Sequence, residues 1–237
     1  MTTILGLGNP LLDISVTVSE LSLAEKYSLK MGDACLASAE QFALYGELES
    51  GVAGPVAYIA GGATQNTIRV AQWISGAPSG YTAYIGSVGS DTFGTKLKAA
   101  AEADGVKVLY QVQPADGKPT GTCAVIVHNK ERSLCANLAA AEALNVAHLE
   151  TPAVAAAIDE AKFIYTAGFP LTHEGGAASC VKLGEAAVAS AGSKKYAINL
   201  SAPFICQVRF FVFAMLCFFR HSWNLCVYCY QYKSMKI

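Results

Sequence analysis

The sequence predicts an α/β protein built on an open, mainly parallel β-sheet with helices on both faces. Two observations lead to this fold class. The chain has 237 residues with 53% hydrophobic and 15% charged content, which suits a soluble globular protein with one large core. Strand-like runs alternate with helical segments from residue 4 to residue 200, and repeated β-then-α order is typical of parallel strands joined by helices.

The first elements follow from start and stop signals in the sequence. Residues 4–8 are apolar and end in Gly-Asn-Pro, which predicts a buried strand. The capping box Ser38-Ala-Glu-Gln41 satisfies backbone N–H groups at a helix start and predicts a helix over 38–48. After Gly61-Gly62, apolar residues recur at helical spacing over 63–75, and 81–88 has the composition of a strand.

The later elements continue the same alternation. Gly105 closes one predicted helix, and Thr151-Pro152 supplies an N-cap and a first-turn proline for another. In chain order we expect helix 93–103, strand 106–112, strand 123–128, helix 151–161, strand 163–167, helix 174–191 and strand 196–200.

Two segments, 14–18 and 106–113, alternate apolar and polar residues, as strands with one face in water do. We therefore predict that they form a small β lid over the edge of the main sheet. In open parallel sheets, ligands bind outside the carboxyl ends of the strands. The loops expected at those ends are Gly8-Asn9, Gly86 to Gly89, Ala167-Gly168 and Asn199 to Pro203.

The composition changes abruptly at residue 206. Residues 206–237 hold 9 of the 23 aromatic residues and 4 of the 8 cysteines, and they contain no Asp, Glu, Gly or Pro. We therefore divide the chain into an α/β domain, 1–205, and a divergent aromatic and cysteine-rich tail, 206–237. Translation of non-coding sequence, such as a retained intron, is one explanation for the tail. A genuine interaction tail is the alternative, because its four basic residues are unopposed by any acid.

Composition and patterning also exclude several classes of protein. A formal net charge of −1 argues against a nucleic-acid binder. The apolar run 210–219 is shorter than the roughly 20 residues of a membrane span, so we expect no membrane insertion. The N-terminus has no basic leader pattern, which predicts a cytoplasmic location, with or without a nuclear fraction. Cys226 and Cys229 form a C-x-x-C without a glycine knuckle, so we predict no metal site.

Three polar features at strand ends are candidates for ligand binding. Asp13 follows the first strand, where its carboxylate can accept both hydrogen bonds of a sugar diol; a turn aspartate is the alternative. Gly61-Gly62 and Asn66 place bare backbone and an amide at a helix start; a tight loop is the alternative. Arg132 can meet phosphate oxygens or be a solvated loop residue.

Other patterns in the chain carry no comparable signal. Gly6-Leu-Gly8 lacks the third glycine of a dinucleotide-binding turn, and Gly89 to Lys96 departs from the phosphate-binding loop because Thr95 separates the lysine from the second glycine. None of the four histidines has partners at metal-ligand spacing. We therefore expect them to have surface or loop roles.

Several collinear blocks between residues 4 and 205 nevertheless share a pattern with one family. The blocks include Asn9-Pro-Leu-Leu-Asp13, Gly61-Gly-Ala-Thr-Gln-Asn66, Gly86-x-x-Gly-x-Asp91-x-Phe-Gly94 and Asn199-Leu-Ser-Ala-Pro-Phe204. They resemble the adenosine kinase branch of the ribokinase-like carbohydrate and nucleoside kinases. The resemblance implies a ribokinase-like fold and ATP- and Mg²⁺-dependent phosphorylation of the 5′-hydroxyl of adenosine, giving AMP in purine salvage. It also implies a monomer whose small-molecule partner is adenosine.

The same resemblance assigns roles to particular residues. The ribose hydroxyls would contact the polar and backbone groups of Asn9, Asp13, Gly62 and Asn66, and Gly61 would also belong to the substrate-binding site. Arg132 would help to neutralise the transferred phosphate. Apolar side chains would line the slot for base and sugar, namely Leu11, Leu36, Cys123, Leu134, Ala136, Leu138 and Phe204.

The sequence also departs from the family pattern. Ala34 and Pro170 stand where the family has a base-contacting glutamine and an aromatic residue, which predicts altered base selectivity. The family's Gly-Ala-Gly-Asp motif, whose aspartate takes the 5′-hydroxyl proton, and its metal-associated Asn-x-x-Glu motif do not occur. We therefore assign no catalytic and no metal-binding residue, and expect the C-terminal part of the fold and most of the ATP site to be missing.

These observations lead to three hypotheses about the function. The first is an adenosine kinase whose present chain is truncated and catalytically impaired. The second is a non-catalytic fragment that binds nucleoside, and the third is a related sugar kinase. A parallel sheet without its later strands would have an unpaired edge, so we also expect aggregation.

Overall fold

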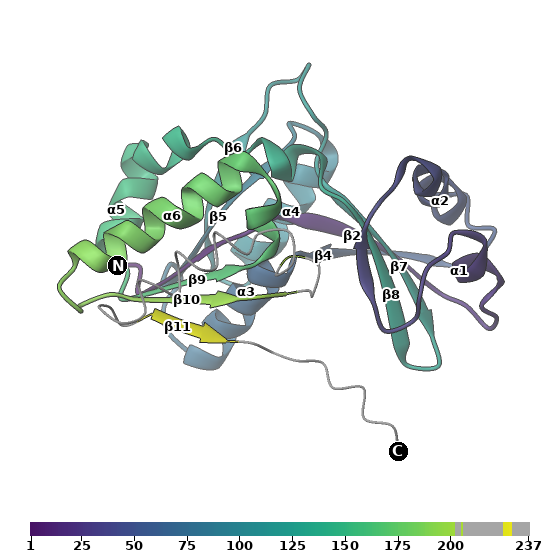
Figure 1. Cartoon of the computed structure of the whole chain (residues 1–237), viewed down its shortest axis with the longest axis horizontal. Helices are drawn as coiled ribbons and strands as arrows, with labels where there is room; N and C mark the ends of the chain where they lie inside the picture. The colour runs from purple at the N-terminus through teal and green to yellow at the C-terminus, as the bar shows by residue number, and fades with distance from the viewer. Residues whose placement is uncertain (202–204, 206–224, 229–237) are drawn as a thin grey trace.

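The computed structural model describes residues 1–201, 205 and 225–228 of the chain (Figure 1). Its larger sheet has six parallel strands in the order β11-β10-β9-β1-β5-β6. The strands are β1 Ile4–Leu7, β5 Thr82–Val88, β6 Lys107–Val112, β9 Phe163–Ala167, β10 Lys195–Asn199 and β11 Leu225–Tyr228.

Helices cover both faces of this sheet. Helices α3 (Ala63–Ser75) and α4 (Thr92–Ala103) lie on one face, and α5 (Pro152–Glu160) and α6 (Glu174–Ala189) lie on the other (Figure 1). The two faces follow from the alternation of side chains along β1. Ile4 packs toward α3, whereas Leu5 and Leu7 are fully buried against the α5 and α6 side. The predicted α/β architecture is therefore confirmed.

A second, five-stranded sheet stands beside the first, with the strand order β3-β8-β7-β2-β4. Its strands are β2 Leu11–Thr17, β3 Ala34–Leu36, β4 Val56–Gly61, β7 Thr122–His128 and β8 Glu131–Asn137. Helices α1 (Ser22–Lys26) and α2 (Phe42–Glu49) pack on its outer face (Figure 1). Short 3₁₀ turns complete the described elements at Ala39–Gln41, Ala139–Ala143, Val146–Glu150 and Phe169–Thr172.

The lid prediction needs one correction. Residues 14–17 belong to β2 and thus to the second sheet, but 106–113 contains β6, which pairs with β5 at the edge of the main sheet. The assignment of 106–113 to the lid is therefore wrong. An edge strand has a partner on one side only, and Val112 at its end is 59% exposed. This position explains why β6 alternates apolar and polar residues although it belongs to the main sheet.

The tail contributes to the main sheet, which the sequence did not lead us to expect. Strand β11 runs parallel to β10, with Ala197 opposite Cys226 and Ile198 opposite Val227. Strand β11 therefore occupies the edge position beside β10, where we expected the sheet to lack its later strands. Two of the four residues of β11, Val227 and Tyr228, are of types enriched in strands, which is a local reason for the pairing. The apolar run 210–219 and the cysteine at 229 lie outside the described residues.

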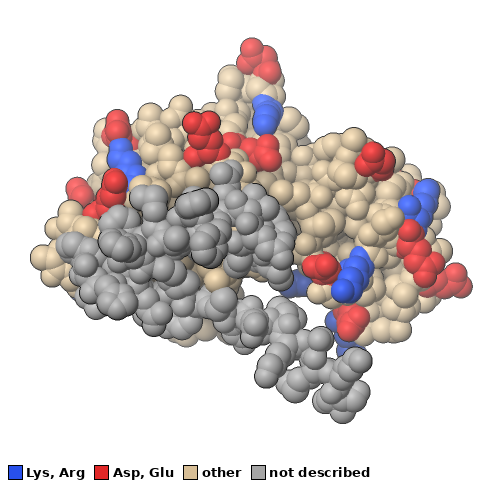
Figure 2. Space-filling model, in the orientation of Figure 1, with Lys and Arg blue, Asp and Glu red and all other residues tan. Residues whose placement is uncertain are grey.

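Charged side chains are interspersed over the described surface. On the face shown in Figure 2, Lys and Arg lie among Asp and Glu. Several charged side chains of the described chain form local ion pairs, such as Lys26–Glu47 and Lys182–Glu150. Within the described part of the chain, no helix has the length and apolar character needed to cross a bilayer.

Candidate functional site

The chain passes from the main sheet to the second sheet through one short segment. Asn9 follows the carboxyl end of β1, and β2 begins at Leu11 and carries Asp13. Asn9 is buried, with 7% of its surface exposed. Because β1 lies in the middle of the parallel sheet, this segment leaves the sheet at the edge where ligands of such folds bind.

The glycine pair at the end of β4 closes around this segment. A side chain on Gly61 would collide with the carboxylate of Asp13, and a Cβ on Gly62 would lie 2.5 Å from the carbonyl oxygen of Asn9. Gly62 also has a φ of +96°, which L-residues rarely adopt. The structure therefore brings together Asn9, Asp13 and Gly62, three of the four residues expected around the ribose, with Gly61, which was also expected in the substrate site.

The Asp13 carboxylate is half-buried and accepts no hydrogen bond from any described residue. Burial raises the pKa of Asp13 from 3.8 to about 6, and the positive charge of Arg132 opposes this rise. None of the described residues donates a hydrogen bond to this carboxylate, so its acceptor sites are available to a ligand.

An apolar cluster lies on the same face of the second sheet as Asp13. Strand register places Leu36, Ala136, Cys123 and Asp13 opposite one another across four strands. Side chains in such a row project to the same face. The cluster contains all six described residues predicted for the apolar slot, namely Leu11, Leu36, Cys123, Leu134, Ala136 and Leu138. Burial raises the pKa of the Cys123 thiol, so this thiol is neutral at physiological pH.

The sequence missed three members of this cluster: Val125, Val127 and Ala141. The two valines had a detectable signal, because Cys123, Val125 and Val127 alternate along one strand and must share a face. Ala141 had none, since it reaches the cluster from the 3₁₀ turn after β8.

Asn66 and Arg132 are exposed, although the backbone N–H of Asn66 bonds to the carbonyl oxygen of Gly62 at 2.9 Å, and a third predicted residue lies outside the described residues. Asn66 is exposed on α3, where its Oδ1 accepts a hydrogen bond from Arg69 at 3.3 Å. Arg132 is exposed on β8, four residues before Ala136 and therefore about 13 Å along the strand. Phe204 is not among the described residues.

A histidine far away in the sequence contacts this site. The Nε2 atom of His173 lies 3.2 Å from the Oδ1 atom of Asn9. The other amide atom, Nδ2 of Asn9, is buried and has no hydrogen-bond partner in the described part of the chain. His173 is half-buried and caps α6 from the connection before the helix, which agrees with the predicted loop position, but no sequence pattern indicated its contact with Asn9. His128 and His148 have structural roles, since their rings bond to the carbonyl oxygens of Val18 and Leu109.

The comparisons with known proteins show the family of this chain. Residues 24–224 match the pfkB family of carbohydrate kinases. The chain belongs to this family. It is 46% identical to adenosine kinase 1 of Arabidopsis thaliana over 204 residues, which are 86% of this chain and 56% of that protein.

Solved structures give the same result for the fold. A crystal structure of Anopheles gambiae adenosine kinase in complex with P1,P4-di(adenosine-5) tetraphosphate superposes with a TM-score of 0.81 and 39% identity, covering 90% of this chain and 60% of that one. Schistosoma mansoni adenosine kinase in complex with adenosine gives a TM-score of 0.81 and 32% identity, covering 89% and 58%. The chain thus spans less than two thirds of the length of these relatives.

A metal centre has no support in the described part of this pfkB-family chain. No group of three or more His, Cys, Asp or Glu side chains there is arranged to hold a metal ion. The Cys226 and Cys229 pair lies outside the side chains that the structure describes.

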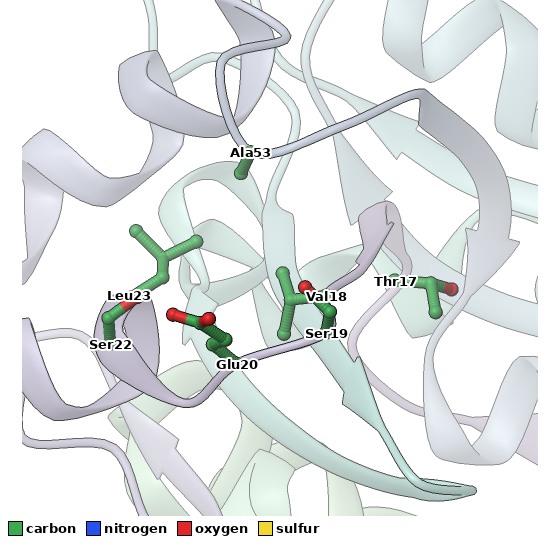
Figure 3. Close-up of a pocket in the computed structure, with 7 residues that line it drawn as sticks. All are labelled: Thr17, Val18, Ser19, Glu20, Ser22, Leu23 and Ala53. Carbon is green, nitrogen blue, oxygen red and sulfur yellow. The ribbon is translucent and has the colours of Figure 1, made fainter.

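A pocket of about 370 Å³ lies apart from the Asp13 cluster. Figure 3 shows it between the end of β2 with the following turn, the start of α1, and Ala53 after α2. Glu20 is its one charged lining residue. Since the predicted site residues do not line this pocket, the candidate site of this pfkB-family chain remains the cluster around Asp13.

Proposed function

We propose that this chain binds adenosine and that the protein transfers phosphate from ATP to the adenosine 5′-hydroxyl, giving AMP in purine salvage. One observation carries the proposal. The carboxylate of Asp13, which no described residue bonds, lies with the buried Asn9 amide and the Gly61-Gly62 turn at the end of an apolar face. The adenosine kinases among its relatives support the substrate class.

The chemistry of this cluster suits the ribose of a nucleoside. A vicinal diol has two hydroxyl donors, and an ionised carboxylate can accept both of them. Each hydroxyl also accepts a hydrogen bond, which the Nδ2 group of Asn9 can donate. The apolar cluster beside Asp13 offers the purine ring a surface without polar groups to desolvate.

The described residues account for binding rather than for phosphoryl transfer. When bound, ATP supplies the phosphoryl group and Mg²⁺ neutralises its charge. The described residues contain no cluster that fits Mg²⁺, and the sequence contains neither Gly-Ala-Gly-Asp nor Asn-x-x-Glu. We therefore assign no step through either group. We propose that the 237-residue chain binds adenosine but transfers phosphate poorly.

Calorimetric titration of the purified chain with adenosine tests the binding, and ATP-dependent AMP formation tests the transfer. We expect saturable binding that Asp13→Asn abolishes and Asp116→Asn, a change in an exposed turn, leaves intact. Ribose without the base should bind far more weakly. Failure of wild-type chain to bind adenosine contradicts the proposal, and preference for a free sugar would favour a sugar kinase. Turnover typical of a complete enzyme would contradict the impaired transfer.

A further inference from the structure

The position of His173 is fixed from both sides of its imidazole ring. It is the N-cap residue of α6, where Nδ1 accepts a hydrogen bond from the backbone N–H of Gly176 at 3.1 Å. The Nε2 atom, on the opposite side of the ring, lies 3.2 Å from Oδ1 of Asn9. The two residues are 164 positions apart in the sequence, so only the fold brings them together.

These two contacts determine where the protons are. A backbone N–H can only donate, so the Nδ1 atom that faces Gly176 has no proton. A neutral imidazole then carries its proton on Nε2 and donates it to Asn9. The atom of Asn9 that receives this bond must be an acceptor, which fixes it as the carbonyl Oδ1. The amide group Nδ2 is thereby turned away from His173.

The orientation of Asn9 matters because its Nδ2 group is buried and has no hydrogen-bond partner among the residues that the structure describes. A buried donor without a partner destabilises a protein, and such groups are rare. Asn9 lies beside Gly62 and is two residues before Leu11 of the apolar cluster. A ligand hydroxyl in the candidate site would satisfy this donor.

We propose that His173 is a positioning residue for ribose recognition, which holds the Asn9 carboxamide with Nδ2 directed at a ribose hydroxyl. This inference rests on the proposed binding of adenosine. If the amide were reversed, its NH₂ group would face the Nε2–H of His173, and two donors would oppose each other. Nδ2 would then be lost as a donor to the ligand.

The first turn of α6 holds the ring in this place. A side chain on Gly176 would collide with the imidazole of His173 and with the carbonyl oxygen of Pro170. The backbone N–H of His173 also lies 3.5 Å from that carbonyl oxygen. The helix start therefore acts as the support that keeps one tautomer and one ring orientation.

Two substitutions at position 173 separate positioning from helix capping. His173→Asp keeps an N-cap acceptor, and its charge suits the helix N-terminus, but it has no donor for Asn9. His173→Gln keeps an N–H donor at a reach close to that of Nε2, but it is a poor cap. We expect His173→Asp to have a melting temperature near the wild-type value and to bind adenosine about five- to tenfold more weakly. We expect His173→Gln to have a lower melting temperature, with a dissociation constant for adenosine within about twofold of the wild-type value.

Titrations with deoxynucleosides identify the ribose hydroxyl that accepts the hydrogen bond from Nδ2 of Asn9. We would titrate 2′-deoxyadenosine and 3′-deoxyadenosine separately. One of these analogues lacks the hydroxyl that faces Asn9, and it should bind to the wild-type chain and to His173→Asp with equal affinity. Likewise, His173→Asp should have no further effect in an Asn9→Ala background.

Three outcomes would overturn the inference while the proposed function stands. The first is wild-type affinity for adenosine in His173→Asp. The second is binding that follows thermal stability in both variants, which indicates a purely structural role. The third is an equal loss for adenosine and for both deoxy analogues. Absence of adenosine binding by the wild-type chain would instead contradict the proposed function itself.

Discussion

Asp13 is subject to two opposing requirements: burial favours its neutral form, whereas binding of a diol requires its ionised form. Its carboxylate lies on an otherwise apolar face, and none of the described residues donates a hydrogen bond to it. Burial therefore raises its pKa to about 6. A carboxylate that accepts hydroxyl hydrogen bonds must be ionised, so the protonation of Asp13 and the binding of a diol exclude each other.

The first prediction concerns the pH dependence of adenosine binding. Because the ionised form of Asp13 binds the diol, affinity should rise as pH increases through about 6 and level off near pH 7.5. Each pH unit below the pKa reduces the ionised fraction tenfold, so at pH 5 binding should be about ten times weaker than at pH 7. Titration calorimetry between pH 5 and pH 8 measures this.

A variant at Arg132 provides the control for this pH profile. The guanidinium of Arg132 lowers the pKa of Asp13, so Arg132→Gln should shift the midpoint of the profile to higher pH. An affinity that does not change between pH 5 and pH 8 would contradict the assignment of Asp13 as the diol acceptor.

The second prediction is that the empty protein gains stability when Asp13 loses its charge. The folded pKa lies above the unfolded value, so the folded state binds more protons between pH 4 and pH 6 and the free energy of unfolding falls as pH rises through that window. A rise from 3.8 to about 6 corresponds to about 3 kcal/mol.

Asp13→Asn should therefore raise the melting temperature at pH 7.5 while it abolishes adenosine binding. Thermal denaturation of both proteins without ligand measures the change, and Asp116→Asn in the exposed turn is the matched control. A lower melting temperature for Asp13→Asn would show that the carboxylate has a stabilising partner.

At the scale of the elements, the N-terminus of α4 connects the two halves of the fold. Asp91 caps the helix by accepting from the N–H of Gly94 at 2.9 Å, and it accepts two further bonds from the N–H and hydroxyl of Thr120 at 2.7 and 2.6 Å. Thr120 precedes β7, so a single carboxylate ties a helix of the main sheet to a strand of the second. Although burial acts to raise the pKa of Asp91, these hydrogen bonds lower it overall.

The third prediction follows from this arrangement. Asp91→Ala removes the cap and leaves the Thr120 groups without their acceptor, so the free energy of unfolding should fall by about 2 kcal/mol or more. Urea denaturation measures it. Thr120→Ser keeps the hydroxyl and the backbone N–H and should stay close to wild type. A loss below about 0.5 kcal/mol in Asp91→Ala would contradict the connecting role.

The elements also show where sequence patterns succeed and where they mislead. Helix 63–75 and strand 163–167 were predicted with their exact bounds because their signals are local. The alternation in 106–113 was detected correctly but assigned to the wrong sheet. Alternation reports that one face is exposed, and both an edge strand and a lid strand meet that condition. Likewise, β11 depends on pairing with a distant strand, which no local pattern specifies.

At the scale of the whole molecule, the candidate site lies where the two sheets meet. Asn9 and Gly62 border the main sheet, whereas Asp13 and the apolar cluster belong to the second sheet. A ligand held by both sets of groups would connect the sheets, and such a ligand stabilises the folded state by mass action.

The fourth prediction is a thermal shift on adenosine binding. At a concentration one hundred times the dissociation constant, adenosine should stabilise the fold by about 2.7 kcal/mol, which raises the melting temperature of a chain of this size by roughly 5–10 °C. Differential scanning fluorimetry measures it. Asp13→Asn should show no shift at the same concentration, and an equal shift in that variant would indicate binding elsewhere.

The sequence by itself determined the fold class and most of the residues that form the candidate site. Strands, helices and caps depend on neighbours within a few positions, and Asn9, Asp13 and Gly61-Gly62 lie in short motifs. The tertiary structure decided the sheet to which β6 belongs, the pairing of β11 and the contact of His173 with Asn9. These features depend on groups that are far apart in the chain, such as two side chains separated by 164 residues. Packing of the whole chain, rather than any local preference, determines whether such groups meet.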